Sequence, residues 1–243
     1  MIKNFLRFIY ESKYDSLSED IAKSVMTIIT DSARPITKRR IQKTLEYFEP
    51  ISFSLTLFIS RDTIFEPEKR KHFKNIPWEK SNFKNNGFAL DANSFIPTND
   101  DIVDPEIEIH LIINPESEQS CHRSLYYKLL DAIRHEIEHL LQKGTNVQYS
   151  HTGFQVDKNR KSAESSFNYF LLPDEVPAMV SGMRLSSISK DVPIDQEFEE
   201  YLAPIKDSGF ITDEQFKKVM KNWIKFTIKH FPETKISKKY RVY

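Results

Sequence analysis

The chain of 243 residues contains a single cysteine, Cys121. One thiol excludes an internal disulfide and any zinc site made of several cysteines, and it suits a reducing compartment. Cys121 lies in a polar segment just before the most regular helical pattern of the sequence. We interpret it as a buried or incidental thiol, not as a nucleophile.

Net charge and long apolar runs are also missing. Lys+Arg 35 balance Asp+Glu 35, so composition favours neither a nucleic-acid nor a membrane partner. No apolar run approaches the ~20 residues that span a membrane. The first 15 residues are interrupted by Lys3, Arg7 and Glu11 and lack a small-residue cleavage site, which indicates an amphipathic helix and no signal peptide. No internal repeat or low-complexity tract is present.

The strongest pattern is Ser124 to Gly144, SLYYKLLDAIRHEIEHLLQKG. Leucine and isoleucine recur at three- and four-residue spacing, which predicts one helix with Ser124 as N-cap and Gly144 as its end. Within it, His135, Glu136 and His139 form HExxH. Histidines four residues apart point the same way, so both imidazoles can bind one metal ion at about 2.0–2.1 Å. Glu136 projects beside them, where a general base can reach a metal-activated water.

A catalytic zinc needs a third protein ligand, and no histidine follows at the metzincin spacing. Glu175 is the best candidate, because Pro173 and Asp174 mark the start of a second helix. Ala178, one turn later, is small enough to let that helix approach the HExxH helix closely. The alternative is that Glu175 is an ordinary acid favoured by the helix dipole. The fallback third ligands are Glu164 and His151.

HEIEH followed by ExxA on a later helix resembles the gluzincin branch of the zincin metallopeptidases. More loosely, RHEIEH with a later LLPDEVPAMV resembles small HExxH proteins encoded by tailed bacteriophages and other large viruses. The resemblance covers Glu106 to Met183. It implies one zinc ion per chain bound by His135, His139 and Glu175, and a zinc metallopeptidase that hydrolyses peptide bonds with Glu136 as general base.

The same resemblance implies a protein or peptide substrate, and the balanced charge and short apolar runs favour no membrane partner. We expect a cytoplasmic protein, in the host-cell cytoplasm or the virion if the chain is viral, with a virion or assembly partner in that case. An alternative of another class is a zinc-stabilised structural or assembly protein with little or no peptidase activity, in which zinc acts as a folding staple. The lysine-rich C-terminal region is interpreted as a solvated face, and the alternative is a docking surface for an acidic partner or nucleic acid.

Zincins commonly stabilise the oxyanion with a tyrosine or histidine that is not a metal ligand. The resemblance therefore makes Tyr149, His151 and Tyr169 candidates for transition-state or substrate contacts. Asp131 lies one turn before His135 and is a candidate carboxylate for orienting a ligand imidazole.

The remaining segments predict an α+β, zincin-like fold. We expect a helical region over 1–50, a metallopeptidase core with a small, mostly antiparallel sheet over 51–185, and a helical region over 186–243, all in one compact unit. Ser16 and Glu19 predict a capping box that starts a helix ending before Pro35, and a further helix is expected over Lys38–Phe48. Helices are also expected over 195–205 and from the Thr212–Gln215 capping pair to Phe231.

Alternating apolar and polar residues predict strands over 51–59, 87–96 and 107–113. The resemblance to zincins implies that an edge strand of the sheet borders the active cleft; if the third strand is that edge, we expect Glu106, Glu108 and His110 to favour basic residues in the substrate. The alternative is that these charges discourage edge-to-edge aggregation. The polar segment 61–86 carries basic and aromatic residues and is interpreted as a solvated loop or hairpin.

Overall fold

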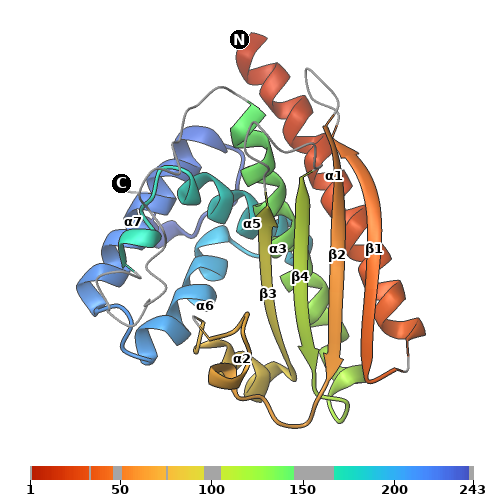
Figure 1. The fold of residues 1–243 in the computed structure, drawn as a ribbon. Helices are drawn as coiled ribbons and strands as arrows, with labels where there is room; N and C mark the ends of the chain where they lie inside the picture. Colours follow the sequence, from red (N-terminus) through yellow and green to blue (C-terminus); the bar gives the residue numbers. More distant parts are fainter. Residues whose placement is uncertain are drawn as a thin grey trace.

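The computed structural model describes residues 2–32, 34–45, 51–74, 76–95, 105–144 and 167–240, and of residues 2–12, 45, 51, 143 and 144 it describes the backbone only. The fold is α+β, as predicted, with a mixed four-stranded sheet in the order β1-β2-β4-β3 (Figure 1). The strands are β1 (Ile36–Leu45), β2 (Ile51–Arg61), β3 (Phe88–Phe95) and β4 (Glu106–Ile113). The helices are α1 (Ile2–Asp31), α2 (Glu79–Asn86), α3 (Glu118–Gly144), α5 (Glu175–Lys190), α6 (Ile194–Asp207) and α7 (Asp213–His230), with short 3-10 turns at Pro67–Lys69 and Lys238–Tyr240.

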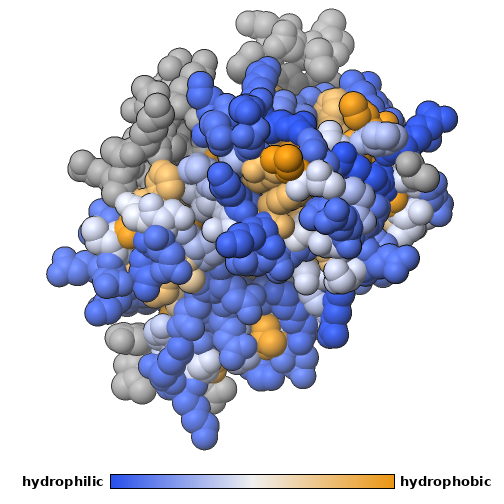
Figure 2. Space-filling model, turned by 90° about the horizontal axis from the view of Figure 1, so that it is seen from below, coloured by the Kyte–Doolittle hydropathy of each residue, from blue (hydrophilic) through white to orange (hydrophobic). Residues whose placement is uncertain are grey.

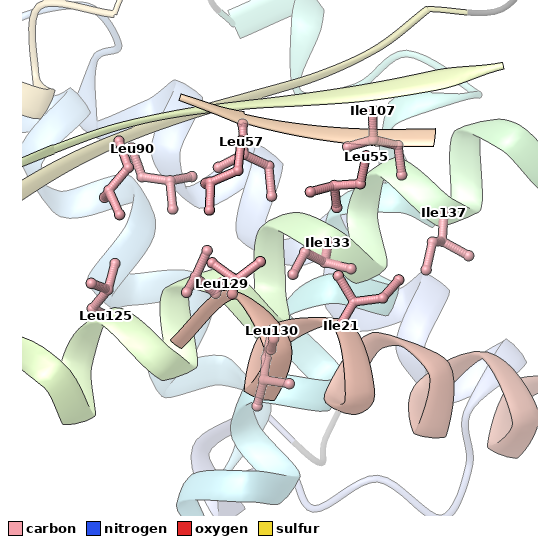
Figure 3. Close-up of a cluster of buried hydrophobic side chains, with 14 of the residues drawn as sticks. Ile21, Leu55, Leu57, Leu90, Ile107, Leu125, Leu129, Leu130, Ile133 and Ile137 are labelled. Carbon is pink, nitrogen blue, oxygen red and sulfur yellow. The ribbon is translucent and has the colours of Figure 1, made fainter. Parts of the chain in front are cut away.

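Two of the three strand pairs, β1–β2 and β3–β4, are antiparallel, and β2–β4 is parallel. Helices α1 and α3 cover one face of this sheet, and α5, α6 and α7 lie beside its β3 edge (Figure 1). Aliphatic side chains of the sheet, among them Leu55 and Leu57, face Ile133 and Leu129 of α3, and Ile21 of α1 joins the same cluster (Figure 3). A second cluster lies around Trp223 between α5, α6 and α7. The sheet and the helical region thus each have a core, and α3 and α5 meet between them.

Three predicted strands and the helices α5, α6 and α7 are confirmed. The predicted capping box at Thr212 is present, since its hydroxyl accepts from the Gln215 N–H at 3.2 Å and the Gln215 side chain accepts from the Thr212 N–H at 2.9 Å. A capping box satisfies two otherwise unpaired amides at the start of a helix. This explains why α7 begins at Asp213.

Two expectations for the first 50 residues are wrong. Ser16 does not start a helix, because α1 runs without a break through the predicted capping pair. The segment predicted as a helix over Lys38–Phe48 forms strand β1 in its described part, paired along its length with β2. Hydrogen bonds with the long partner strand β2 decide this conformation. The spacing of apolar residues within the segment gives no information about that pairing. The region 1–50 is therefore not purely helical.

The position predicted for the third strand is also wrong. β4 pairs with β2 on one side and β3 on the other, so β4 is internal and β3 is the edge beside the helical region. Glu106 accepts a hydrogen bond from Thr56 of β2, and His110 stacks between Phe58 and His72. Glu108 lies 3.3 Å from His110. These side chains make contacts across the outer face of the sheet, so their expected role at a cleft-bordering edge is not supported.

Segment 61–86 is more ordered than predicted. It contains α2, and its aromatic residues Phe73, Trp78 and Phe83 are buried. Buried rings cannot act as a stacking platform for nucleic-acid bases. The face of the molecule seen in Figure 2 is mainly hydrophilic, with apolar residues scattered over it. Among the helices of the described residues, none combines the length and apolar character that a membrane crossing requires.

Candidate metal centre

Helix α3 presents two different faces. Its leucines and isoleucines, including Leu129, Ile133 and Ile137, are fully buried against the sheet and α1 (Figure 3). This apolar face fixes the rotation of the helix, and His135 and His139 consequently lie on the side that faces α5. The helix begins at Glu118, six residues before the predicted N-cap, and continues to the predicted end. The HExxH motif therefore lies well inside a long, regular helix.

Helix α5 approaches α3 closely enough for backbone contact. A Cβ added at Gly182 would lie 2.4 Å from the Asp131 carbonyl oxygen, which only glycine avoids. Ala178, the small residue that the sequence pointed to, is fully buried. α5 begins at Glu175 with Asp174 as its N-cap, as predicted. Because α5 begins at Glu175 and packs closely against α3, Glu175 lies next to His135 and His139.

The three predicted ligand atoms form a compact triangle. His135 Nε2 and His139 Nε2 are 3.0 Å apart, and Glu175 Oε2 lies 3.6 Å from the first and 3.5 Å from the second. Two ligands of one tetrahedral zinc, each bound at 2.0–2.1 Å, are about 3.3 Å apart. Among the described residues, this is the one group of three or more His, Cys, Asp or Glu with metal-binding spacing.

Glu175 supplies independent support for an ion. Its side chain is almost completely enclosed, with the residue 9% exposed, and the nearest groups to Oε2 are the imidazole nitrogens of His139 and His135, at the long distances of 3.5 and 3.6 Å. A buried carboxylate oxygen without a close partner is costly. A cation held by Glu175 and both imidazoles would remove that cost, so these residues fit a divalent metal of the zinc type.

Electrostatics couple the three side chains. Burial lowers the pKa of His135, and repulsion by His139 lowers it further. Burial also disfavours the charged form of His139, but contact with Glu175 outweighs it and raises the pKa of His139 to about 9. Burial acts to raise the pKa of Glu175, whereas His139 and His135 lower it below its ordinary value. Without metal, a proton on His139 therefore compensates the Glu175 carboxylate.

Gln142 is a contributor that the sequence reasoning missed. Its Oε1 lies 3.3 Å from His139 Nδ1, and its Nε2 donates to the Asp174 carbonyl at 2.8 Å. An Nδ1–H donated to Gln142 leaves Nε2 of His139 available for a metal. The same amide ties the end of α3 to the start of α5. Its position three residues after His139, on the same side of the helix, was the available signal.

Glu136 and Tyr169 lie at a hollow of about 140 Å³ beside the triangle. Glu136 is 5% exposed, and its Oε1 lies 3.9 Å from His135 Nε2. Tyr169 hydrogen-bonds the Glu175 carboxylate through its side chain. The structure thus brings together the candidate base, one candidate tyrosine and the three candidate ligands.

Asp131 lies at the same hollow, and its Oδ2 pairs with Lys128 Nζ at 3.1 Å. The negative charge of Asp131 acts to raise the pKa of His135. Its contacts are thus with Lys128 and α5, and it influences the imidazole through charge. Tyr149, His151 and Glu164 lie outside the described residues.

The chain matches no protein-family model, no curated protein and no solved structure with which it was compared. What points to a function is therefore the motif and the geometry of the centre.

Proposed function

We propose that the protein is a zinc-dependent metallopeptidase. The proposal rests on the triangle of His135 Nε2, His139 Nε2 and the buried Glu175 Oε2, which is spaced for one tetrahedral ion. Two imidazoles and a carboxylate suit zinc, although the same donors also serve other divalent ions. When bound, such an ion polarises a scissile carbonyl and makes a nearby water more acidic.

Glu136 supplies the proton transfers. Its carboxylate lies at the hollow and beside His135, within reach of a water held there. It takes a proton from the attacking water and delivers it to the leaving nitrogen. The water oxygen bonds to the carbonyl carbon, the carbon–nitrogen bond breaks, and the oxygen stays in the new carboxyl group, so one water is consumed. No side chain becomes covalently attached to the substrate.

Tyr169 has a positioning role in this proposal. Its hydrogen bond holds the Glu175 carboxylate, and the side chain also borders the hollow in which the substrate carbonyl would lie. A phenol in this place is suited to stabilise negative charge that develops on that carbonyl oxygen. Of the three residues predicted for this role, Tyr169 is the one within the described chain.

Strand β3 replaces β4 as the candidate substrate-binding edge. Residues Leu90 to Asn93 line the hollow together with His135 and Glu136. A free strand edge can hold an extended peptide by main-chain hydrogen bonds. A substrate bound along β3 would carry a peptide bond past the metal centre.

The test is to incubate zinc-loaded protein with a mixed-sequence peptide library and to identify products by mass spectrometry. We expect cleavage that a chelator abolishes and added zinc restores. Stoichiometric zinc with no cleavage of any peptide would reject the peptidase and favour the alternative, a structural or assembly protein in which zinc joins α3 to α5.

A further inference from the structure

A second hollow adjoins the one at the candidate metal centre. It measures about 210 Å³ and is bordered by residues of α2, α3, α5 and α6. Helices α2 and α6 lie on the β3 side of the molecule (Figure 1). The residues that border both hollows form an open passage between them: Trp78, Glu79, Lys128, Asp131 and Tyr201. A substrate group that enters at the candidate metal centre can therefore extend into the second hollow.

Carboxylates outnumber cations around the second hollow. Its acids are Glu79, Asp131, Glu197 and Glu200, and its bases are Lys128 and Lys190. Among the described residues that border it there is no arginine or histidine. Four carboxylates thus face two ammonium groups, and the balance of charge favours an incoming cation.

The two lysines do not fully compensate these acids. Lys128 contacts Asp131 at 3.1 Å, and Lys190 contacts Glu197 at 2.8 Å. Burial nevertheless keeps the pKa of Glu197 above its ordinary value, although Lys190 acts to lower it. Burial likewise raises the pKa of Glu79, although the charge of Lys128 acts to lower it. A further cation would stabilise the charged forms of both carboxyl groups.

Glu200 is the acid best placed to meet an incoming cation. Lys190 contacts its Oε2 at 3.3 Å, and among the described residues no hydrogen bond engages its Oε1. The Glu200 side chain is 68% exposed. Both oxygens of Glu79 and of Glu197, in contrast, already accept hydrogen bonds. A cation in the hollow can therefore pair with Glu200 without breaking an existing hydrogen bond.

The walls of the second hollow suit a long side chain with an apolar stem. Trp78, Phe88, Met183 and Pro204 border it together with the charged groups. Lysine and arginine carry a charged head on a stem of three or four methylene groups, and such stems pack along apolar surface. The apolar walls and the carboxylates thus match the two parts of a basic side chain, whereas an acidic side chain would meet an excess of like charge.

Distances along α3 place such a side chain next to the scissile bond. Asp131, in the passage, is about 6 Å from His135 along the helix, and Lys128 is about 10.5 Å from it. Successive residues of an extended substrate are roughly 3.3 Å apart. A residue immediately beside the cleaved bond is therefore near enough to the passage for a four-carbon stem to carry its charge into the second hollow.

We propose that the second hollow binds a lysine or arginine side chain of the substrate, adjacent to the scissile bond, and that Glu200 determines this specificity. The inference rests on the proposed peptidase function and names its substrate class, peptides that carry a basic residue. It differs from the expectation for β4, because Glu106, Glu108 and His110 border neither hollow.

Binding tests this subsite without catalysis. Zinc-loaded Glu136→Gln protein is titrated by calorimetry with two hexapeptide libraries, which are identical except that every peptide carries either lysine or norleucine at one fixed central position. Norleucine keeps the four-carbon stem and removes the charge. We expect the lysine library to bind about three- to tenfold more tightly, an effect between those of an exposed ion pair and a buried charged hydrogen bond.

Variants of α6 test whether Glu200 is responsible. Glu200→Gln/Glu136→Gln should lose most of the preference for lysine, and Glu200→Asp/Glu136→Gln should keep part of it. The matched control is Glu199→Gln/Glu136→Gln, because Glu199 lies on the same helix but pairs with Lys239 and does not border the hollow. Equal binding of the two libraries to the Glu136→Gln protein, or a preference that survives Glu200→Gln unchanged, would overturn the inference.

The products of the wild-type protein separate this inference from the proposed function. We expect cleavage beside lysine in the first library and at least about threefold slower cleavage of the norleucine library. Equal cleavage of both libraries would contradict the subsite while leaving a peptidase. Cleavage of neither library would contradict the peptidase itself, and the binding comparison would still decide whether the second hollow takes a basic side chain.

Discussion

Glu136 is the residue that separates metal binding from hydrolysis. It borders the hollow without belonging to the triangle of candidate ligands. We predict that Glu136→Gln binds zinc as the wild type does but hydrolyses peptides about 10²–10⁴-fold more slowly, the usual contribution of a general base. Zinc content and turnover of the same samples provide the measurement. Glu214→Gln, on the exposed surface of α7, should change neither, and hydrolysis that survives Glu136→Gln would refute the assigned role.

The pKa of His139 predicts how pH affects metal uptake. In the metal-free protein this pKa is raised from 6.5 to about 9. The protonated His139–Glu175 contact therefore stabilises the metal-free fold fully below pH 6.5, and this contribution is lost as pH rises through 9. A metal must displace the same proton, so zinc uptake at pH 8 should release about one proton per chain, and apparent affinity should rise with pH up to about 9. Calorimetry in buffers of different ionisation enthalpy measures this, and metal binding without proton release would contradict it.

The residues of the centre were predictable to the extent that they follow local spacing. His135 and His139 were named from the HExxH motif, which places them one helical turn apart, and Glu175 from a recognisable helix start and the resemblance to gluzincins. For Gln142, the spacing from His139 on the same helix was an available signal. Its hydrogen bond to the Asp174 carbonyl joins two helices and depends on how they pack, which no spacing within one helix encodes.

The α3–α5 contact should be sensitive to a single methyl group. In Gly182→Ala the new Cβ would meet the Asp131 carbonyl at 2.4 Å, and backbone cannot move aside as a flexible side chain does. We expect a loss of about 1–3 kcal/mol in unfolding free energy, larger than the gain in helix propensity, together with weaker zinc binding. Urea denaturation and zinc titration measure the two effects. Ile188→Ala, at an exposed position of the same helix, is the control, and an unchanged zinc affinity in Gly182→Ala would argue against close packing as the source of the geometry.

At the scale of helices and strands, prediction succeeded where a segment's own periodicity decided its structure. It failed for β1, whose Ile41 and Leu45 also fit a helical spacing, because pairing with β2 is a contact between segments. It also failed for the place of β4 in the sheet. The apolar run Leu111-Ile112-Ile113 at the end of β4 was a missed signal, since consecutive buried residues are typical of an internal strand covered on both faces.

A network of buried charges joins the first helix to both helices of the candidate metal centre. Asp15 of α1 accepts from Arg134 of α3 at 3.1 Å and also pairs with Arg184 of α5. Arg134 is 1% exposed and Arg184 is 6% exposed. Arg134 also donates to Glu138 at 2.8 Å. This network thus ties α1 to the two helices that carry the candidate ligands.

Removing Asp15 should therefore affect the whole molecule. We predict that Asp15→Asn lowers the unfolding free energy by about 3 kcal/mol or more, because two buried guanidinium groups lose a common counter-ion. Chemical denaturation measures this, and Glu19→Gln, which breaks the exposed pair with Lys23, should cost less than about 1 kcal/mol. An equal loss of unfolding free energy in the two variants would mean that the buried network does not stabilise the packing of α1 against α3 and α5.

Zinc bound per chain after equilibrium dialysis measures most directly whether His135, His139 and Glu175 hold one metal ion. We predict one zinc in the wild type and in Glu164→Ala, and a large loss in His135→Ala and Glu175→Ala. Protein that binds no zinc, or that binds it equally well without His135 or Glu175, would contradict the metal centre and the function proposed from it.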